Sequence, residues 1–483
     1  MKPYCYIFIS ILLAAGSTSC KKSFLDEGIA NTRILTRQDY VKDLKTTSEY
    51  LSGIYTKVAS DLFSGYHIIY PELAADNIKP VVGTGAGGAT PLGAHYEWNQ
   101  RVDDMSSTSV TSTSFNCNEL SYGAYQLIRS CNFVLEKATE YKDQDPSLAD
   151  AMMGQAYAIR ALSHFFLVNV FAQSYNFSND ASHPGIVYIT SVNWTDPIKS
   201  RNTVAEVYVN VIQDLKAAVS LLPVASSSTL TMNRNAAIGL LARVYLFKGD
   251  WGLAKNLARQ VVAAVPIMTA NYPSKLFTLE EKEVLFQLPP GIFPVDQYGS
   301  TFPGAYFRSD LQFRATADIA SLLNEDPNDA RKVWVTSVLG NWHITKFPVN
   351  VVTGGFSPDG AYYHSVLRSS ELYLMAAEAY AQLNNVDSAR FYLDAIRMRA
   401  NPAALPTTTS GIVLLEAIYK ERRKELAFEG WRMFDLLRWK KGVTRADALS
   451  AAAQMLPYPS NKAISPIPGL DVKVSDFVQN LDY

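Results

Sequence analysis

The residues best suited to chemistry lie close together in ERRKELAFEGWRMFDLLRW, which runs from Glu421 to Trp439. Glycoside hydrolysis uses two carboxyl groups across a cleft, one of them with a raised pKa. In this stretch, however, an arginine stands three residues from each of three acids, a spacing at which helical side chains meet. The pairs are Arg422–Glu425, Glu429–Arg432 and Asp435–Arg438. A nearby guanidinium lowers the pKa of a carboxyl group, so the spacing predicts a partly buried ion-pair lattice that fixes a helix pair, rather than a catalytic site.

The same stretch is expected to form two helices. Apolar residues recur at three- and four-residue steps on both sides of Gly430. Glycine inside a helix costs about 1 kcal/mol relative to alanine. We therefore expect one helix to end near Gly430 and a second to begin after it.

Other motifs lack the context that catalytic, cofactor or metal sites need. GTGAGG (83–88) matches the dinucleotide pattern G-x-G-x-x-G, but a proline and no helical period follow it, which favours a surface loop. The six histidines show no metal-ligand spacing, and His164 is expected to be a hydrogen-bonded core residue. DQD (143–145) lacks the glycine and closing glutamate of a calcium loop. We therefore expect no catalytic residue, no metal and no cofactor, with an exported hydrolase that uses carboxylates dispersed over long loops as the alternative.

The overall charge argues against nucleic acid as a partner. The 483-residue chain has 44 Lys and Arg against 45 Asp and Glu, a formal net charge of −1. Nucleic-acid-binding proteins carry a basic surplus, which is absent here. The chain has 27 tyrosines, more than the core alone is expected to need, so some can form a ligand-binding face. A tyrosine ring can stack on a ligand while its hydroxyl group stays hydrated.

The N-terminal residues read as an export signal. Lys2 precedes an apolar run over residues 4–15, and small residues then lead to Cys20. The run is shorter than the ~20 apolar residues that span a membrane, and its layout is that of a signal peptide. The cysteine at its end resembles a bacterial lipoprotein signal, which implies removal of residues 1–19 and lipidation of Cys20. An ordinary secreted protein with an incidental cysteine is the alternative.

Two further cysteines, Cys117 and Cys131, are expected to be free and buried. If the intervening residues form one helix, the α-carbons lie ~21 Å apart at 1.5 Å per residue. A disulfide requires less than about 7 Å.

The chain is predicted to be mainly α-helical from about residue 39. Residues 149–173 are apolar on most sides and should be deeply buried. Residues 203–223 begin with Thr203 and Glu206, the pattern of a capping box. Segments 240–262 and 371–397 place aromatic and small residues alike around a short polar turn, which predicts tetratricopeptide-like helix hairpins. A short strand is expected within residues 281–289.

We therefore expect tetratricopeptide-like helix hairpins that support a loop-rich ligand-binding region with few short strands. Residues 1–19 are the signal peptide, 20–38 a tether, and 39–483 a single domain. The helical scaffold covers about 39–75, 115–173, 203–285 and 367–450. Long Gly-, Pro- and aromatic-rich loops cover about 76–114, 174–202 and 286–366, and loops of this length tend to carry function.

Residues 421–439 resemble the C-terminal signature of the SusD/RagB family of Bacteroidetes outer-membrane lipoproteins. FLDE after Cys20, ELAADN (72–77) and the helical segments 156–172, 203–223, 236–251 and 366–383 are similar to family blocks in the same order. The resemblance implies a non-catalytic lipoprotein, anchored in the outer membrane and exposed at the cell surface. It also implies that the protein captures an oligosaccharide and passes it to a SusC-like TonB-dependent transporter.

The resemblance also implies where the ligand binds. Glycan sites of the family combine an aromatic platform with polar side chains from loops. The matching residues are Asp76, Asn77, Tyr96, Trp98 and Asn99 in the first loop and Tyr298, Phe302, Tyr306 and Arg308 in the third. Trp98 is the expected principal platform, and for each aromatic residue the alternative is packing that anchors the loop. A peptide or another nutrient is the alternative ligand.

Overall fold

A computed structural model describes most of the chain after residue 35. The described residues are 36–63, 65–84, 92–100, 102, 117–192, 200–225, 228–289, 295–296, 299–300, 306–307, 312–348, 362–475 and 477–483. The predictions for the signal peptide, Cys20, Tyr298, Phe302, Arg308 and most of GTGAGG fall outside these residues. Over the described part of the chain, no helix combines the length and apolarity that crossing a membrane requires.

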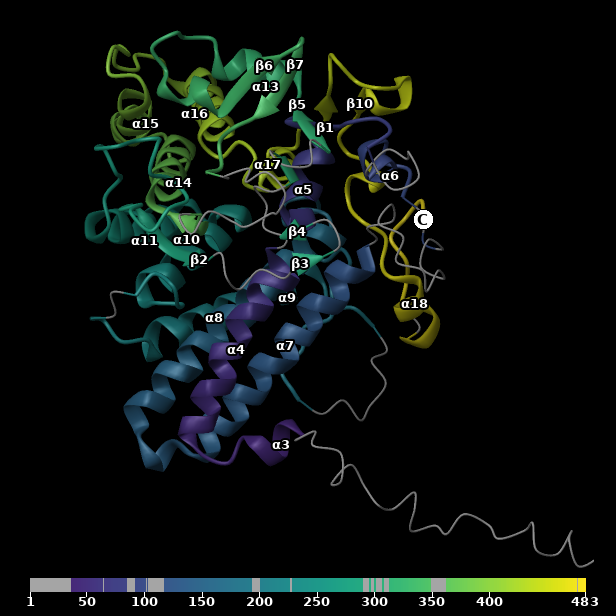
Figure 1. Cartoon of the computed structure of the whole chain (residues 1–483), viewed down its shortest axis with the longest axis vertical. Coiled ribbons are helices and arrows are strands. Elements are labelled where there is room, and N and C mark those ends of the chain that lie inside the picture. The colour runs from purple at the N-terminus through teal and green to yellow at the C-terminus, as the bar shows by residue number, and fades with distance from the viewer. Residues whose placement is uncertain are drawn as a thin grey trace, which may run out of the picture.

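Four long helices pack side by side in the lower part of Figure 1. The helix α8 lies between α7 and α9, and α4 packs on both α7 and α8. Their bounds are α4 Leu44–Leu62, α7 Cys117–Glu140, α8 Pro146–Phe171 and α9 Val204–Leu221. Cys117 and Cys131 lie on the single helix α7, as predicted, and Cys131 is a free, buried thiol.

Local sequence signals explain where these helices begin. The side chain of Asp145 accepts a hydrogen bond from the backbone N–H of Leu148, and Pro146 occupies the first turn of α8. Thr203 and Glu206 form the predicted capping box at the start of α9. The expectation that residues 149–173 are deeply buried is confirmed, because most of the side chains of α8 are buried.

Two helix hairpins follow, and both were predicted. The first is α10 (Arg234–Lys248) with α11 (Trp251–Ala264), and the second is α14 (Ser369–Gln382) with α15 (Val386–Ala400). Gly249 and Asn384 make the turns with positive φ angles of 83° and 57°. The helix α14 packs against α11 and also against α16, Gly411–Glu425, so the hairpins form one continuous stack.

The two hairpins are joined by a short antiparallel sheet. The predicted strand in residues 281–289 is β2, Val284–Leu288, and it pairs with β8, His364–Arg368, which leads directly into α14. Both strands are buried along their whole length.

The stretch 286–366, expected to be an irregular loop, contains more regular structure than predicted. It includes β5 (Phe313–Ala315), α13 (Ala317–Leu323), the 3₁₀ helix η5 (Ala330–Trp334) and the hairpin of β6 (Val335–Val338) with β7 (Asn341–Ile344). These elements are too short for periodicity to detect, and β5 pairs with the distant β1, Ile78–Pro80. The remaining described elements are α3 Arg37–Tyr40, α5 Gly65–Leu73, α6 Gly93–Tyr96, η3 Lys142–Gln144, β3 Val295–Asp296, β4 Gly299–Ser300, α17 Arg432–Arg438, β9 Val443–Thr444, η6 Ala451–Ala453, β10 Met455–Leu456, η7 Asn461–Ala463 and α18 Gly469–Ser475.

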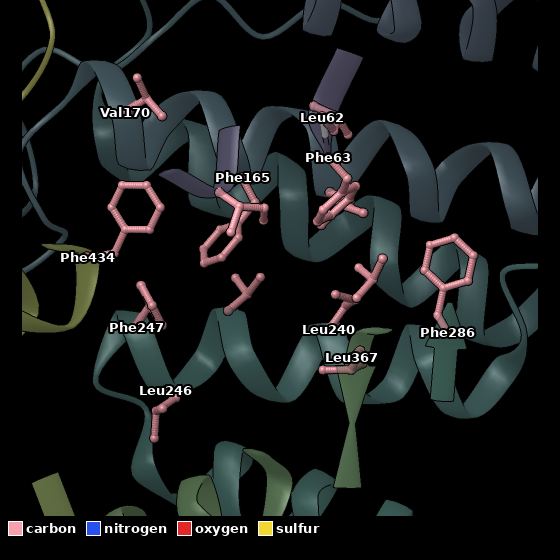
Figure 2. Close-up of a cluster of buried hydrophobic side chains, with 14 of the residues drawn as sticks. Leu62, Phe63, Phe165, Val170, Leu240, Leu246, Phe247, Phe286, Leu367 and Phe434 are labelled. Carbon is pink, nitrogen blue, oxygen red and sulfur yellow. The ribbon is translucent and has the colours of Figure 1, made fainter. Parts of the chain in front are cut away.

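One hydrophobic core runs through these layers. Figure 2 shows side chains from α4, α8, α10, β2, β8 and α17 meeting in one cluster. Its labelled members include Leu62, Phe165, Phe247, Leu367 and Phe434, which come from segments far apart in the sequence. The fold is therefore a mainly helical scaffold with short two-stranded sheets, in agreement with the predicted class.

Candidate functional site

The stretch 421–439 forms the two helices that were predicted, with the break at Gly430. Gly430 has a φ of 84°, a left-handed conformation that favours glycine. The break exposes backbone N–H groups, and the buried carboxylate of Glu72 on α5 accepts three of them. Its oxygens lie 2.8 Å from the nitrogen of Gly430, 3.1 Å from that of Trp431 and 3.2 Å from that of Phe428. This contact ties the N-terminal helices to the C-terminal helix pair.

Arginines from distant elements surround the acids at this break. Glu425 lies 2.6 Å from the guanidinium nitrogens of both Arg368 and Arg399, and 3.2 Å from Arg331. Glu429 contacts Arg368 and the ammonium of Lys346, each at 2.6 Å. All of these side chains are buried. The predicted ion-pair lattice therefore exists, and it is more deeply buried than expected.

The detailed pairing differs from the prediction. Asp435–Arg438 is present at 2.8 Å, but the other two pairs, Arg422–Glu425 and Glu429–Arg432, are wrong. Arg422 instead contacts Asp435 at 2.8 Å, and Arg432 contacts Asp76 at 2.7 Å. Tertiary packing brings in partners from β8, α15 and the first loop, and these contacts replace the local ones.

The electrostatics of the lattice do not suit acid–base catalysis. Burial alone would raise the pKa of Glu425, but Arg399, Arg368 and Arg331 hold it well below its ordinary value. The pKa values of Glu429 and Asp435 are lowered for the same reason. A general acid needs a raised pKa and access to a substrate, so these acids act as scaffold.

One further buried carboxyl group, that of Glu281, has a raised pKa instead of a lowered one. Burial, together with the neighbouring Glu283, raises the pKa of Glu281 to about 7. Glu281 is only 3% exposed. It accepts hydrogen bonds from the backbone N–H of Phe277 at 2.7 Å and the hydroxyl of Ser365 at 2.6 Å. Its pKa suits a general acid, but its burial keeps it from a substrate.

The predicted ligand residues Asp76 and Asn77 are buried where the first loop begins. Asp76 accepts hydrogen bonds from Arg432 at 2.7 and 2.9 Å. Burial would raise the pKa of Asp76, but Arg432 and Arg423 lower it to about 2. Asn77 donates to Glu72 at 2.7 Å and accepts from Arg423 at 2.9 Å. In this arrangement both side chains already bind protein groups and fix the loop to the scaffold.

Tyr96 and Trp98 are also buried, with exposures of 2% and 5%. The guanidinium of Arg445 lies 4.1 Å from the centre of the Tyr96 ring and 4.2 Å from that of Trp98. The indole N–H of Trp98 donates to the carbonyl of Ala74 at 2.8 Å. The expected platform at Trp98 is therefore not presented to solvent here, and the ring has the loop-anchoring role that was the alternative.

Arg445 holds the first loop in place, and sequence reasoning missed it. It donates to the carbonyls of Leu73, Ala75, Tyr96 and Ala453 at 2.6–3.0 Å. Burial lowers its pKa to about 10. Nothing in the local sequence around Arg445 marks this role, because three of its four partners lie 349–372 residues earlier in the chain.

The other candidates are placed differently. Asn99 is exposed beyond α6, and its side chain donates to Glu97 at 3.3 Å. Tyr306 is buried, next to Phe307, whose ring stacks on Phe347 at 5.6 Å. The structure brings Asp76, Asn77, Tyr96 and Trp98 together around α5 and α6 with their side chains buried. Asn99, the fifth first-loop candidate, is the one among them whose side chain is exposed.

His164 is the hydrogen-bonded core residue that was predicted. Its Nδ1 lies 3.0 Å from the carbonyl of Arg160, and its Nε2 accepts from the backbone N–H of Ile189 at 3.0 Å. Burial lowers its pKa to about 3, so the ring is neutral at pH 7. Within the described part of the chain, no cluster of three or more His, Cys, Asp or Glu side chains could hold a metal ion.

Comparison with known proteins identifies matching families. A family model described as "Starch-binding associating with outer membrane" matches residues 88–246, and one described as "SusD family" matches residues 314–467. SusD-like protein P2 of Formosa agariphila is 23% identical over 92% of both chains. SusD-like protein P25 of the same organism is 22% identical over 80% of both chains.

Solved structures show the same fold. A SusD superfamily protein from Bacteroides thetaiotaomicron has a TM-score of 0.77 and 24% identity, covering 91% of this chain and 100% of the other. A SusD-like carbohydrate-binding protein from Bacteroides vulgatus has a TM-score of 0.74 and 19% identity, covering 90% and 97%. A laminarin-binding SusD-like protein has a TM-score of 0.66 and 21% identity, covering 92% and 100%.

Proposed function

Since the chain belongs to the SusD family, we propose that it is a non-catalytic, surface-exposed lipoprotein that captures an oligosaccharide. It passes the sugar to a SusC-like TonB-dependent transporter in the outer membrane. The observation that carries this proposal is the match of residues 88–246 to a starch-binding, outer-membrane-associated family model. That segment includes α6 and the exposed Asn99.

The lattice supports the non-catalytic part of the proposal. In the stretch 421–439, Glu425, Glu429 and Asp435 are buried and paired with cations, which lowers their pKa values. A retaining or inverting glycosidase needs two carboxyl groups that face a sugar across open space. Capture of the sugar therefore depends on side chains outside this lattice, which we expect within the loop segments 76–114, 174–202 and 286–366.

The structure changes which residue best tests the ligand site. Replacing the buried Trp98 would alter the loop itself, whereas Asn99 can be changed without disturbing a packed side chain. We propose that Asn99 hydrogen-bonds sugar hydroxyl groups at this face, and that Tyr298, Phe302 and Arg308 contribute from the third loop. An exposed amide and aromatic rings together are the usual elements of a sugar site.

Affinity electrophoresis of the mature protein on laminarin, starch and other neutral glycans tests capture directly. Retardation by one glycan is expected, with loss of retardation in Asn99→Ala. Asn210→Ala on α9, a partly exposed asparagine on the helical scaffold, is the matched control and should behave like the wild type. Absence of retardation on every glycan, with binding of peptides instead, would favour the alternative nutrient.

Two further measurements test the rest of the proposal. Incubation with the retained glycan should release no shorter sugars, and release would show a hydrolase. A Cys20→Ser variant expressed in a Bacteroidetes host should lose its attachment to the membrane fraction, whereas lipidation of the wild type should be visible by labelled fatty acid. Co-purification of a large barrel protein with the wild type would support the transporter partner.

A further inference from the structure

A pocket of about 450 Å³ opens on the helical scaffold, in a place to which no role has been given. It lies among α11, α14 and α15, and α15 and α6 stand at opposite edges of the molecule in Figure 1. The volume is within the range of about 300–1,000 Å³ found for small-molecule sites. The pocket is therefore separate from α6 and the adjacent Asn99.

One wall of the pocket is a polar stripe on α11. Asn256, Arg259, Gln260 and Ala263 follow the spacing i, i+3, i+4 and i+7, which places them on one helical face. The first three side chains are exposed. The small Ala263 leaves room at the end of the stripe, so the wall offers a guanidinium and two amides to a ligand.

The opposite wall is aromatic and held rigid. The ring of Tyr392 on α15 stacks on Tyr380 with centroids 5.7 Å apart and planes 10° apart. Tyr373 also contacts Tyr392, in a T-shaped arrangement with ring centroids 5.7 Å apart. Phe391 meets Tyr392 edge to face at 5.1 Å and is 67% exposed. A fixed tyrosine beside an exposed phenyl ring is a preorganised stacking surface.

The charge of the pocket is positive. Arg259 forms no ion pair with a carboxylate in the described part of the chain, and its electrostatic partners are Tyr380 and Tyr392. Neither acid on α15 pairs with Arg259: Asp394 pairs with Arg397 at 2.7 Å, and the fully exposed Asp387 lies 3.8 Å from Arg390. An anionic group entering the pocket would therefore meet a guanidinium without a competing carboxylate.

We propose that this pocket is a second binding site, for a sugar that bears a carboxylate, such as a uronate unit of an acidic oligosaccharide. The apolar face of the sugar ring stacks on Phe391. The carboxylate pairs with Arg259, whose planar fork matches its geometry. The hydroxyl groups bond to Asn256 and Gln260. This site goes beyond the capture proposed for the loop-bearing face, and its test does not depend on that capture.

Isothermal titration of the mature protein with trigalacturonate and with an alginate trimer tests the proposal, with maltotriose and triglutamate as comparison ligands. At least one uronate trimer is expected to bind, and both Phe391→Ala and Arg259→Gln should weaken that binding at least tenfold. Val209→Ala on α9 and Arg129→Gln on α7 are matched controls, because both residues are exposed and lie outside the pocket. Both controls should bind as the wild type does.

Three results would overturn the proposal. They are failure of both uronate trimers to bind, uronate binding that neither pocket variant weakens, and pocket variants that weaken the binding of maltotriose or triglutamate more than that of the uronates. Thermal unfolding of each variant shows whether a loss of binding reflects a loss of fold. Binding of neutral glycans to Asn99→Ala and to the pocket variants separates the two faces, because each set of changes should affect only its own ligand.

Discussion

At the level of single residues, aromatic side chains that were predicted to bind the ligand instead hold the first loop against the scaffold. Trp98 and Tyr96 hold a guanidinium between them, and that guanidinium comes from Arg445, far along the chain. Sequence analysis placed these aromatic rings in the correct segment, but it offered two roles for them. The choice depends on a partner about 350 residues away, which no local spacing can reveal.

Arg445→Met should destabilise the protein strongly. The variant keeps most of the side-chain volume but leaves four buried carbonyl groups without their donor. Unsatisfied buried groups cost about 1–3 kcal/mol each, so we expect a loss of at least about 3 kcal/mol in the free energy of unfolding. Urea denaturation followed by tryptophan fluorescence measures it. Lys473→Met on the exposed surface of α18 is the control, and equal stability of the two variants would contradict the anchoring role.

Glu281 gives a prediction for pH dependence. Its pKa is raised to about 7 in the folded protein, so the folded state keeps a proton that the unfolded state has already released. Its contribution to stability is therefore full at pH values below its ordinary pKa. The contribution falls as the pH rises toward 7, by up to about 3 kcal/mol at 1.36 kcal/mol per unit.

The variant Glu281→Gln removes this titration. Relative to the wild type, it should gain stability between pH 5 and pH 8, as measured by urea denaturation at each pH. Histidines with lowered pKa values affect both proteins equally, so the difference between the two isolates Glu281. Glu280→Gln, at an exposed neighbouring position, should show no such gain. A constant difference between Glu281→Gln and the wild type across this range would refute the assignment.

At the level of elements, the sequence carried most of the information about helices. The capping box at Thr203, the break at Gly430 and both hairpins follow from residue types a few positions apart. The short strands within 286–366 were missed because each has only two to five residues, and β5 also pairs with the distant β1. The sequence predicted that an ion-pair lattice exists, but two of the three predicted pairs were wrong. The arginines that contact Glu425 come from the distant elements β8, η5 and α15.

Two glycine substitutions should have opposite effects. In Gly430→Ala the new Cβ would lie 3.2 Å from both Cα and Cδ1 of Ile68, at a φ that alanine disfavours, so stability should fall by about 1–3 kcal/mol. Gly53 lies on an exposed face of α4 with no atom within 4 Å of a new Cβ. Gly53→Ala should therefore raise stability by up to about 1 kcal/mol. Thermal unfolding midpoints compare them, and the same sign for both would contradict this reading of the helix break.

At the level of the whole molecule, one core connects all the layers. Buried apolar residues from Leu44 to Ile467 belong to a single cluster, and the ion-pair lattice lies beside it. No part of the described chain has an independent large core, since the only other cluster there is small. The packing that joins these distant segments into one cluster could not be predicted from local sequence patterns.

The protein should consequently unfold in one step. Far-UV circular dichroism reports mainly on the helices, and fluorescence reports on tryptophans such as Trp98 and Trp334 in different layers. The two denaturation curves are expected to coincide for the wild type and for Arg368→Met, which removes a buried partner of Glu425 and Glu429. Its midpoint should fall in both curves together. Separate midpoints for the two probes would show independent units.

The contact of Glu72 with the backbone at Gly430 spans 358 residues. A ribosome adds about 5–20 residues per second, so a nascent chain waits on the order of 20–70 s between making the carboxylate and making the amides that receive it. During that time the first helices can form, but the hydrogen bonds that tie Glu72 to the C-terminal helix pair cannot. Translation therefore leaves this protein without its final tertiary structure until Gly430 and its neighbours have been made.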